Sequence, residues 1–230
     1  MKPSWRQTFL LWAETPEYEE RIRAAQGIIK HAVEECKPYC AVSGGKDSTV
    51  LMDLCLAEDP KMLVFHWDMG RWLVPDPIEE EILANIGTKA IQTMFETSPL
   101  YEKYQRNVPV HAYNRKLYGD IEPRLIGQGY DLCFLGLRAQ ESHRRRRRTM
   151  NGGDRPGRID TSFPLKDLDW RDIWGYIVSE GLPYLEWYDL QEMIGIGYDR
   201  SRLGTFYLDN VGSENVDAVL IPEHMYEFMR

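Results

Sequence analysis

Cysteine is scarce in this chain and is confined to its first part. There are four cysteines among 230 residues, at positions 36, 40, 55 and 133. No two of them form a CxxC pair, so neither a zinc site nor an Fe-S cluster is expected. The pattern instead predicts small buried thiols in a reducing compartment.

Long apolar runs and excess positive charge are also missing. No stretch approaches the roughly eighteen apolar residues of a membrane span, and the first residues lack a signal-peptide pattern. The formal net charge is −8, so no global field attracts the chain to nucleic acid or to a membrane. We therefore expect a cytoplasmic protein without a membrane partner, with ample length for the core of one α/β domain.

One glycine turn dominates what is present. Residues 38–42 are apolar and favour a strand, and residues 49–57 favour a helix. A strand, a glycine turn and a helix N-terminus together form an anion site, since free amides and the helix dipole face the ligand. A simple helix-capping turn is the alternative for a glycine pair alone, but the full string favours phosphate. Its members are Ser43, Gly44, Gly45, Lys46, Asp47 and Ser48.

This turn differs from two well-known phosphate motifs. A Walker A loop needs Gly, four residues and then Gly-Lys-Ser/Thr, whereas Asp47 follows Lys46 here and Cys40 stands where the first glycine is needed. The GxGxxG dinucleotide pattern is absent as well. Asp47 is a candidate Mg²⁺ ligand, with helix capping as its alternative role.

The remaining patterns predict alternating strands and helices. Strands are expected at 38–42, 61–67, 91–95, 131–136 and 159–165, and helices at 16–37, 49–57, 78–86, 113–127 and 167–180. We expect an N-terminal helical segment over residues 1–37 that packs on the core. It is followed by a nucleotide-binding domain over 38–185 and by an irregular tail of the same domain over 186–230.

Two further groups of polar residues lie where predicted strands end. Asp68 stands 23 positions after Gly45. An acidic residue about 20 positions on commonly binds ribose, although a turn Asp is the alternative. Trp67 and Trp72 could stack on adenine or could belong to the core or its rim. Gly136 and Arg138, at the end of the fourth strand, are candidate nucleotide contacts, and the planar guanidinium of Arg138 suits phosphate or sulfate.

Five consecutive arginines, Arg144–Arg148, come shortly afterwards. They are interpreted either as a solvated mobile loop or as a clamp over an anionic nucleotide or a nucleic-acid backbone. Arg145 is the best candidate among them for a ligand contact.

These motifs resemble a known family. The string at 43–48 resembles the pyrophosphate-binding PP-loop of the adenine nucleotide alpha hydrolase superfamily, and the chain is similar within it to phosphoadenosine phosphosulfate (PAPS) reductases. Residues 136–145 resemble the family's Gly-x-Arg…Glu-Ser…Arg signature, and 164–183 resemble its Pro-Leu…Trp…Gly-Leu-Pro segment. The resemblance implies an α/β, Rossmann-like parallel five-stranded sheet with helices on both faces. It also implies an adenine nucleotide (ATP, PAPS or adenylyl sulfate) and Mg²⁺.

The chain departs from this family where reductases carry their chemistry. Thr205 stands where an Arg-x-Gly-Cys segment would have its cysteine, no late cysteine exists, and Asp-Met-Gly replaces Asp-Thr-Gly at Asp68. A thiolate is needed to attack a sulfuryl group. We therefore predict cleavage of ATP between its α and β phosphates, with pyrophosphate release. Catalysis is assigned to Lys46, Asp47, Arg138 and Arg145.

Three alternatives remain open. The first is PAPS or adenylyl-sulfate reduction with an external or non-standard thiol. The second is a non-catalytic nucleotide-binding subunit, in a homo-oligomer or with a partner. The third is a nucleic-acid-modifying, thiolation-type enzyme that uses Arg144–Arg148. The sequence leaves the acceptor substrate undetermined.

Overall fold

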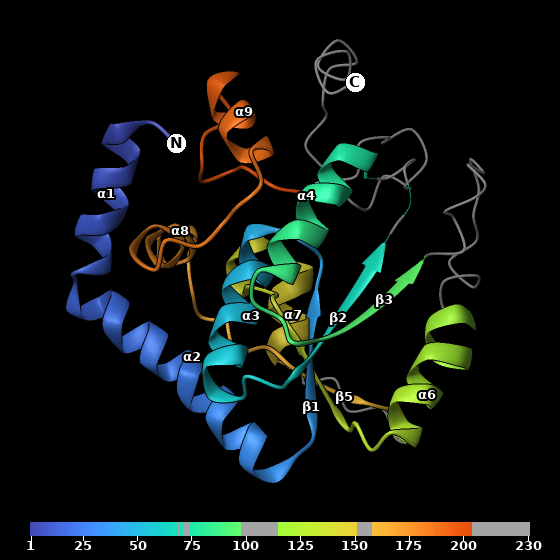
Figure 1. Cartoon of the computed structure of the whole chain (residues 1–230). Coiled ribbons are helices and arrows are strands. Elements are labelled where there is room, and N and C mark those ends of the chain that lie inside the picture. Colours follow the sequence, from blue (N-terminus) through green and yellow to red (C-terminus); the bar gives the residue numbers. More distant parts are fainter. Residues whose placement is uncertain (69, 71–73, 98–114, 151–157, 204–230) are drawn as a thin grey trace.

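A computed structural model describes residues 1–68, 70, 74–97, 115–150 and 158–203. Its centre is a parallel five-stranded sheet of order β3-β2-β1-β4-β5. Figure 1 shows β1, β2 and β3 next to one another. The order reverses between β1 and β4, and open α/β sheets hold ligands at such switch points beyond the carboxyl ends of the strands. The strands are β1 (Pro38–Val42), β2 (Leu63–Asp68), β3 (Gln92–Thr97), β4 (Leu132–Leu135) and β5 (Asp160–Ser162).

Helices cover both faces of the sheet, as the sequence predicts. Along β1, Cys40 and Val42 belong to a core that includes side chains of α2, α3, α4 and α8, while Tyr39 belongs to a second core that includes side chains of α6. This alternation is the period of a strand buried on both sides. The helices are α1 (Pro3–Ala13), α2 (Pro16–Glu35), α3 (Lys46–Glu58), α4 (Asp76–Gly87), α6 (Glu122–Gly127), α7 (His143–Met150), α8 (Trp170–Ser179) and α9 (Trp187–Met193).

Short helical turns join some of these elements. A π-helical turn (Leu117–Ile121) precedes α6, and a 3₁₀ turn (Ala139–Glu141) precedes α7. Within the described part of the chain, no helix has both the length and the apolarity to cross a membrane.

The N-terminal helix α1 packs on α8 through aromatic side chains. Phe9 is fully buried, and its ring stacks on Trp174 with centroids 6.0 Å apart. Trp12 donates its indole hydrogen to Asp172 over 2.9 Å. Asp169 caps α8 and Asp172 completes the capping box, which is the helix start expected near residue 167.

Two expectations about local structure are wrong, and the structure does not show the loop that was one of two alternatives for the arginine run. Helix α3 begins at Lys46 instead of residue 49, because Gly45 takes the extended N-cap conformation. The arginine run is helix α7 and not a loop, and Ser142 caps it by accepting the amide hydrogen of Arg145 over 3.2 Å. The tail is not wholly irregular, since it contains α9; residues 204–230 lie outside the described residues.

A close contact between Gly44 and α4 fixes the glycine turn. Gly44 has a φ of +79°, and a Cβ at this position would collide with Ile82 of α4. Both features restrict the position to glycine, because left-handed backbone and a filled neighbouring space oppose any side chain.

We predict that Gly44→Ala lowers the free energy of unfolding by about 2 kcal/mol or more, from left-handed strain and overpacking together. Urea denaturation measures the change. Gly27→Ala in the middle of α2 is the matched control, because nothing lies within 4 Å of a Cβ there. It should be neutral or slightly stabilising. Equal stabilities for the two variants would contradict this account of Gly44.

Candidate functional site

The glycine turn closes on itself through its two serines. The amide of Ser43 donates to Ser48 Oγ over 3.2 Å, and the Ser48 hydroxyl donates to the carbonyl oxygen of Gly45 over 2.9 Å. Lys46, Asp47 and Ser48 form the first turn of α3. The predicted loop residues are therefore brought together at the carboxyl end of β1, where the positive end of the α3 dipole lies.

A tyrosine from the far end of the chain supports this turn. The Tyr188 hydroxyl on α9 accepts the amide hydrogen of Lys46 over 2.9 Å, and the ring is 1% exposed. Burial raises the pKa of Tyr188 above its ordinary value, so the phenol stays neutral at physiological pH. Sequence reasoning missed this residue because 142 positions separate it from Lys46.

Lys46 and Asp47 form a buried ion pair. Lys46 is 3% exposed, and its Nζ donates to Asp47 Oδ2 over 3.0 Å and to the Ser201 carbonyl oxygen over 3.1 Å. Burial lowers the pKa of Lys46, and Asp47 opposes this only in part. Burial pushes the pKa of Asp47 upward, but the charges of Lys46 and Arg138 outweigh it and hold that pKa below its usual range.

Arg138 joins the same cluster from the end of β4. Its Nε donates to Asp47 Oδ1, so both carboxylate oxygens of Asp47 are engaged by cations. The guanidinium is 3% exposed. Burial alone would lower the pKa of Arg138, but Asp47 and Glu141 raise it and keep the side chain charged.

Glu141 is the second carboxylate of the site and contacts three arginines. Its Oε1 lies 3.5 Å from Arg138 Nη2 and 3.1 Å from Arg202 Nη1, and its Oε2 pairs with Arg145 Nη1. The site thus holds four cations, including Lys46, against two carboxylates. The excess of two positive charges suits an anionic ligand.

Arg202 is held in place through its backbone. Gln191, which is fully buried on α9, accepts the Arg202 amide hydrogen over 2.9 Å and donates to its carbonyl oxygen over 2.7 Å. Sequence reasoning did not assign a role to Glu141, Gln191 or Arg202. Glu141 and Arg202 had a signal only in belonging to motif segments, and Gln191 had none.

Gly136 lets two backbones approach each other. A Cβ there would lie 3.1 Å from the amide nitrogen of Ser48 and 3.2 Å from the carbonyl group of Asp47. A side chain would push the end of β4 away from the start of α3. The glycine of the Gly-x-Arg segment therefore packs the two halves of the site together, and its assignment as a ligand contact stays a prediction.

Asp68 lies at the end of β2 on the same edge of the sheet. Its Oδ1 accepts the amide hydrogen of Gly70 over 2.6 Å, as a turn Asp does. Burial raises the pKa of Asp68, and the Gly70 amide opposes the shift. Trp67 is half-buried against the core around Tyr39, while Trp72 lies outside the described residues. Ribose and adenine contacts at these positions stay predictions.

The arginines of α7 divide into two groups. Arg145 turns inward to Glu141, whereas Arg146, Arg147 and Arg148 are exposed, and Arg148 lies over the Phe163 ring at 5.8 Å. The side chain of Arg144 lies outside the described part of the chain. No observation tests a nucleic-acid contact by these exposed arginines.

The described residues provide few side chains that could ligate a metal ion. Among them, no group of three or more His, Cys, Asp or Glu side chains could hold an ion. Each oxygen of Asp47 already contacts a cation, so Mg²⁺ bound directly there would be repelled by Lys46 and Arg138. Its contacts therefore fit cation positioning better than metal ligation.

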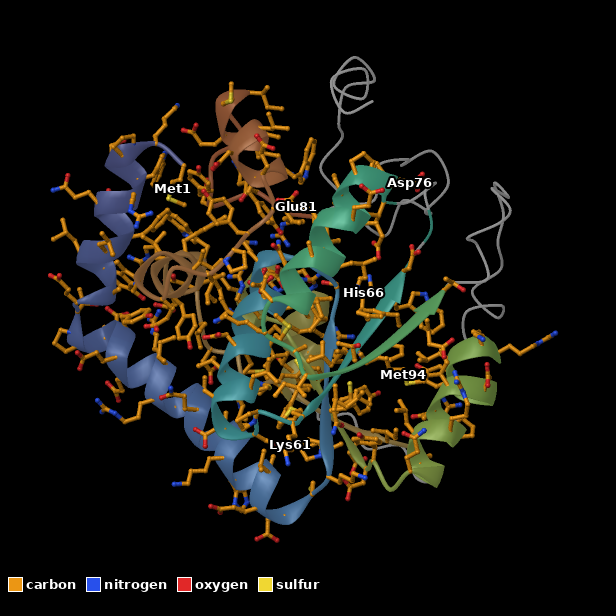
Figure 2. All side chains as sticks on the ribbon, viewed as in Figure 1. Met1, Lys61, His66, Asp76, Glu81 and Met94 are labelled. Atoms are coloured by element: carbon orange, nitrogen blue, oxygen red, sulfur yellow. The ribbon has the colours of Figure 1, made fainter. Side chains whose placement is uncertain are left out.

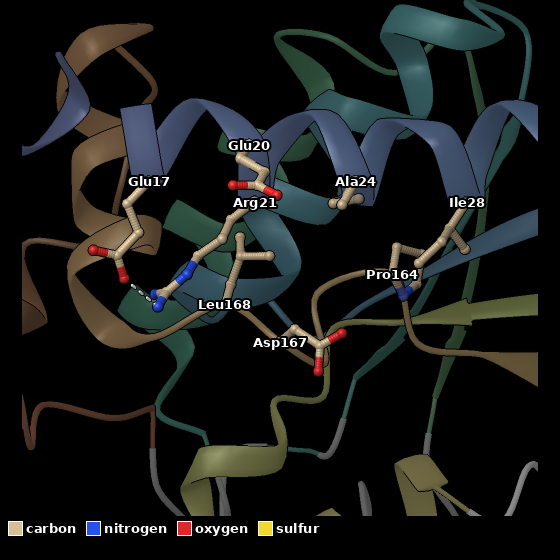
Figure 3. Close-up of a pocket in the computed structure, with 9 residues that line it drawn as sticks. Glu17, Glu20, Arg21, Ala24, Ile28, Pro164, Asp167 and Leu168 are labelled. Atoms are coloured by element: carbon tan, nitrogen blue, oxygen red, sulfur yellow. Dashed lines mark hydrogen bonds and ion pairs between the residues drawn. The ribbon is translucent and has the colours of Figure 1, made fainter. Parts of the chain in front are cut away.

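A separate cavity of about 300 Å³ lies between α2 and residues 164–168. Figure 3 shows the residues that line it. Glu17, Glu20 and Asp167 line it, with Arg21 already paired to Glu17. None of its lining residues belongs to the glycine turn. Its acidic lining disfavours phosphate, so we do not assign the nucleotide to it.

We predict that Glu141→Gln lowers the free energy of unfolding by about 3 kcal/mol, since it leaves buried Arg138 short of countercharge. Added inorganic phosphate should recover more stability in this variant than in the parent, because the positive excess grows. Thermal melts at several phosphate concentrations measure both effects. Glu19→Gln, an exposed control in α2, should match the parent, and an equal phosphate response in all three proteins would refute the anion site.

Comparisons with known proteins agree with this architecture. The structure resembles PAPS reductase from Candida auris in its phosphate complex, with a TM-score of 0.52 and 15% identity over 76% of this chain and 92% of that chain. It resembles the U34-tRNA thiolase NcsA from Methanococcus maripaludis with its 4Fe-4S cluster, with a TM-score of 0.51 and 12% identity over 79% and 76% of the two chains.

A third similar structure is NMN synthetase from Francisella tularensis, with a TM-score of 0.51 and 10% identity over 84% of this chain and 89% of that one. At such identities the likeness shows the fold alone. No curated protein matches the chain with significant similarity. The family model described as "Phosphoadenosine phosphosulfate reductase domain" matches residues 37–207. Since that match spans well over half of the sequence, this chain belongs to the PAPS reductase domain family.

Proposed function

We propose that this protein binds an adenine nucleotide at residues 43–48 and cleaves ATP between its α and β phosphates, transferring the adenylyl group to an acceptor. The observation that carries the proposal is the positive excess around the turn. Four cations contact the two carboxylates of Asp47 and Glu141 there, namely Lys46, Arg138, Arg145 and Arg202. Membership of the PAPS reductase family supports adenine nucleotide as the ligand class.

Each part of the site has a role in this reaction. The amides at the start of α3 and the Lys46 ammonium would bind the leaving pyrophosphate. Arg138 and Arg145 would stabilise the charge that develops on the bridging oxygen as the bond breaks. Asp47 and Glu141 hold these cations in position before the substrate arrives, so little reorganisation is needed during the reaction.

Mg²⁺ is assigned to the phosphates of the incoming nucleotide, because the oxygens of Asp47 are already paired. When bound there, the ion would neutralise phosphate charge. The Asp68 carboxylate, at the neighbouring end of β2, is our candidate for the ribose contact.

Reduction of a sulfonucleotide is the second candidate, and the cysteines argue against it. Cys40 and Cys55 are fully buried and Cys133 is 6% exposed. Burial raises the pKa of Cys133 to about 12 and raises that of Cys55 well above its ordinary value. Cys36 also has a raised pKa, chiefly from burial, and precedes β1 at the opposite end from the turn. Cys36, Cys55 and Cys133 are therefore poor thiolate nucleophiles at neutral pH, and Cys40 is shielded from solvent by its burial.

Two of the earlier alternatives lack a specific supporting observation. These are a non-catalytic subunit with a partner and a nucleic-acid acceptor bound by the α7 arginines. They are outcomes of the experiments below rather than separate proposals.

The first experiment concerns binding. Arg202→Gln should weaken ATP binding by about tenfold, the effect of losing one charge-assisted contact to phosphate. Isothermal titration calorimetry with ATP, AMP, adenylyl sulfate and PAPS measures it. Arg23→Gln, which removes the same charge from an exposed position on α2, is the matched control and should bind as the parent does. Equal losses in both variants would indicate a general charge effect.

The second experiment concerns catalysis. The protein incubated with Mg²⁺, ATP labelled at the α phosphate and a panel of acceptors should release pyrophosphate and form a labelled adenylyl product or AMP. Lys46→Met should lower turnover by at least about a hundredfold, because it removes a charge aimed at the leaving group. If ATP binds tightly but no acceptor yields pyrophosphate, the non-catalytic subunit becomes the better account.

The third experiment separates the two chemistries. Thioredoxin-dependent release of sulfite from PAPS or adenylyl sulfate should equal the control without enzyme. Cys36→Ser should leave ATP cleavage unchanged, since Cys36 is remote from the turn. Sulfite release that depends on any of the four cysteines would favour the reductase instead.

A further inference from the structure

A buried histidine lies directly beneath the phosphate-binding turn. His66 on β2 is 2% exposed, and its Nδ1 lies 2.7 Å from the carbonyl oxygen of Val42. Its Nε2 lies 2.6 Å from Oε1 of Glu79, which is on α4. Figure 2 shows His66 between the strands and α4. Sequence reasoning assigned no role to His66 or to Glu79.

These two partners determine how many protons the ring carries. A carbonyl oxygen and an ionised carboxylate can only accept hydrogen bonds, so beside an ionised Glu79 both ring nitrogens donate. An imidazole that donates from both nitrogens is the imidazolium cation. Burial alone would lower the pKa of His66, but Glu79 and the Val42 carbonyl outweigh burial and raise it above its ordinary value.

Both hydrogen-bond partners of His66 lie close to the phosphate-binding turn. Val42 is the last residue of β1 and precedes Ser43. Glu79 stands three positions before Ile82, the α4 side chain that fills the space beside Gly44. The imidazolium therefore joins the strand that enters the turn to the helix that packs against it.

We propose that His66 is a positioning residue, whose protonated ring and Glu79 together lock α4 against the phosphate-binding turn at residues 43–48. This lock, the contact between His66 and Glu79, exists in the free protein and does not depend on the reaction. Its effect on ligand affinity rests on the proposed nucleotide site.

Few other groups face this pair. Asp68, two positions along β2, has its oxygen on the Gly70 amide, and its charge raises the pKa of His66 further. The Phe95 ring of β3 meets the imidazole edge to face at 6.2 Å. Burial has the largest effect on the pKa of His66 and lowers it, while Glu79 is the largest of the influences that raise it, ahead of the Val42 carbonyl and Asp68. Glu79 therefore sets the charge of the ring.

The direction of the pH effect follows from the raised pKa. The stabilisation is fully present below the unfolded pKa of about 6.5. It is lost as pH rises through the higher folded pKa, because a neutral ring leaves one nitrogen lone pair facing an acceptor. Above that pH, α4 should separate from the turn, and anion affinity should fall.

The protonation state can be measured directly. Two-bond ¹H–¹⁵N spectra of the ¹⁵N-labelled full chain should show one histidine of the five with both nitrogens protonated at pH 7 to 8. That signal should disappear in His66→Gln and remain in His31→Gln, an exposed control on α2. In Glu79→Gln, which keeps the shape of the side chain, the same histidine should lose its proton at a lower pH. A neutral His66 at pH 6.5 in the parent would overturn the proposal.

The positioning role needs its own readout. Hydrogen exchange at residues 43–48 and in α4 should speed up in the parent between pH 7 and 9 beyond the ordinary base-catalysed rate. It should already be fast and show no such extra rise in Glu79→Gln. ATP affinity should fall about tenfold in Glu79→Gln at pH 7, equivalent to one charge-assisted hydrogen bond, and should lose its dependence on pH.

These outcomes separate the lock from the proposed function. If the parent fails to bind ATP, the proposed function fails, while the spectra and hydrogen exchange still test the lock. If ATP binds equally well to the parent, to Glu79→Gln and to His31→Gln, and exchange at residues 43–48 is the same in all three, then His66 does not position the turn.

Discussion

The balance of buried charge between α3 and the end of β4 is the constraint on which the rest of the site depends. Lys46 and Arg138 are almost completely removed from water, which would be costly for isolated charges. Asp47 lies between them and uses one oxygen for each. This arrangement requires the two backbones to approach closely, and Gly136 permits that approach. One carboxylate therefore sets the distance between the two halves of the site.

The C-terminal part of the described chain forms a wall of the same site. Tyr188 binds the Lys46 amide, the Ser201 carbonyl binds the Lys46 ammonium, and Arg202 reaches Glu141. These contacts connect α9 and the segment after it to the turn at residues 43–48. An anion that enters would meet an excess of two positive charges already held in place by the protein. Preorganised charge of this kind is the main device of phosphoryl-transfer enzymes.

Family membership and chemistry rest on different parts of the chain. The match to the PAPS reductase domain over residues 37–207 establishes the scaffold, and three solved structures at 10–15% identity share its fold. The choice between phosphate chemistry and reduction depends instead on the cysteines. Three of them are buried in the core, and Cys36, which is half-buried, lies at the far end of β1 from the turn.

The sequence by itself determined the elements that depend on local pattern. The strand at 38–42 and the glycine turn follow from local patterns, whose interactions act between near neighbours. The parallel five-stranded sheet followed from the resemblance of the short motifs to a family. Only the tertiary structure decided which charges meet. Three of these contacts join separate elements of the fold: Glu141 with Arg202, Tyr188 with Lys46, and His66 with Glu79. Local pattern cannot predict them, because chain folding sets the distance between such residues and the burial that makes their charges matter.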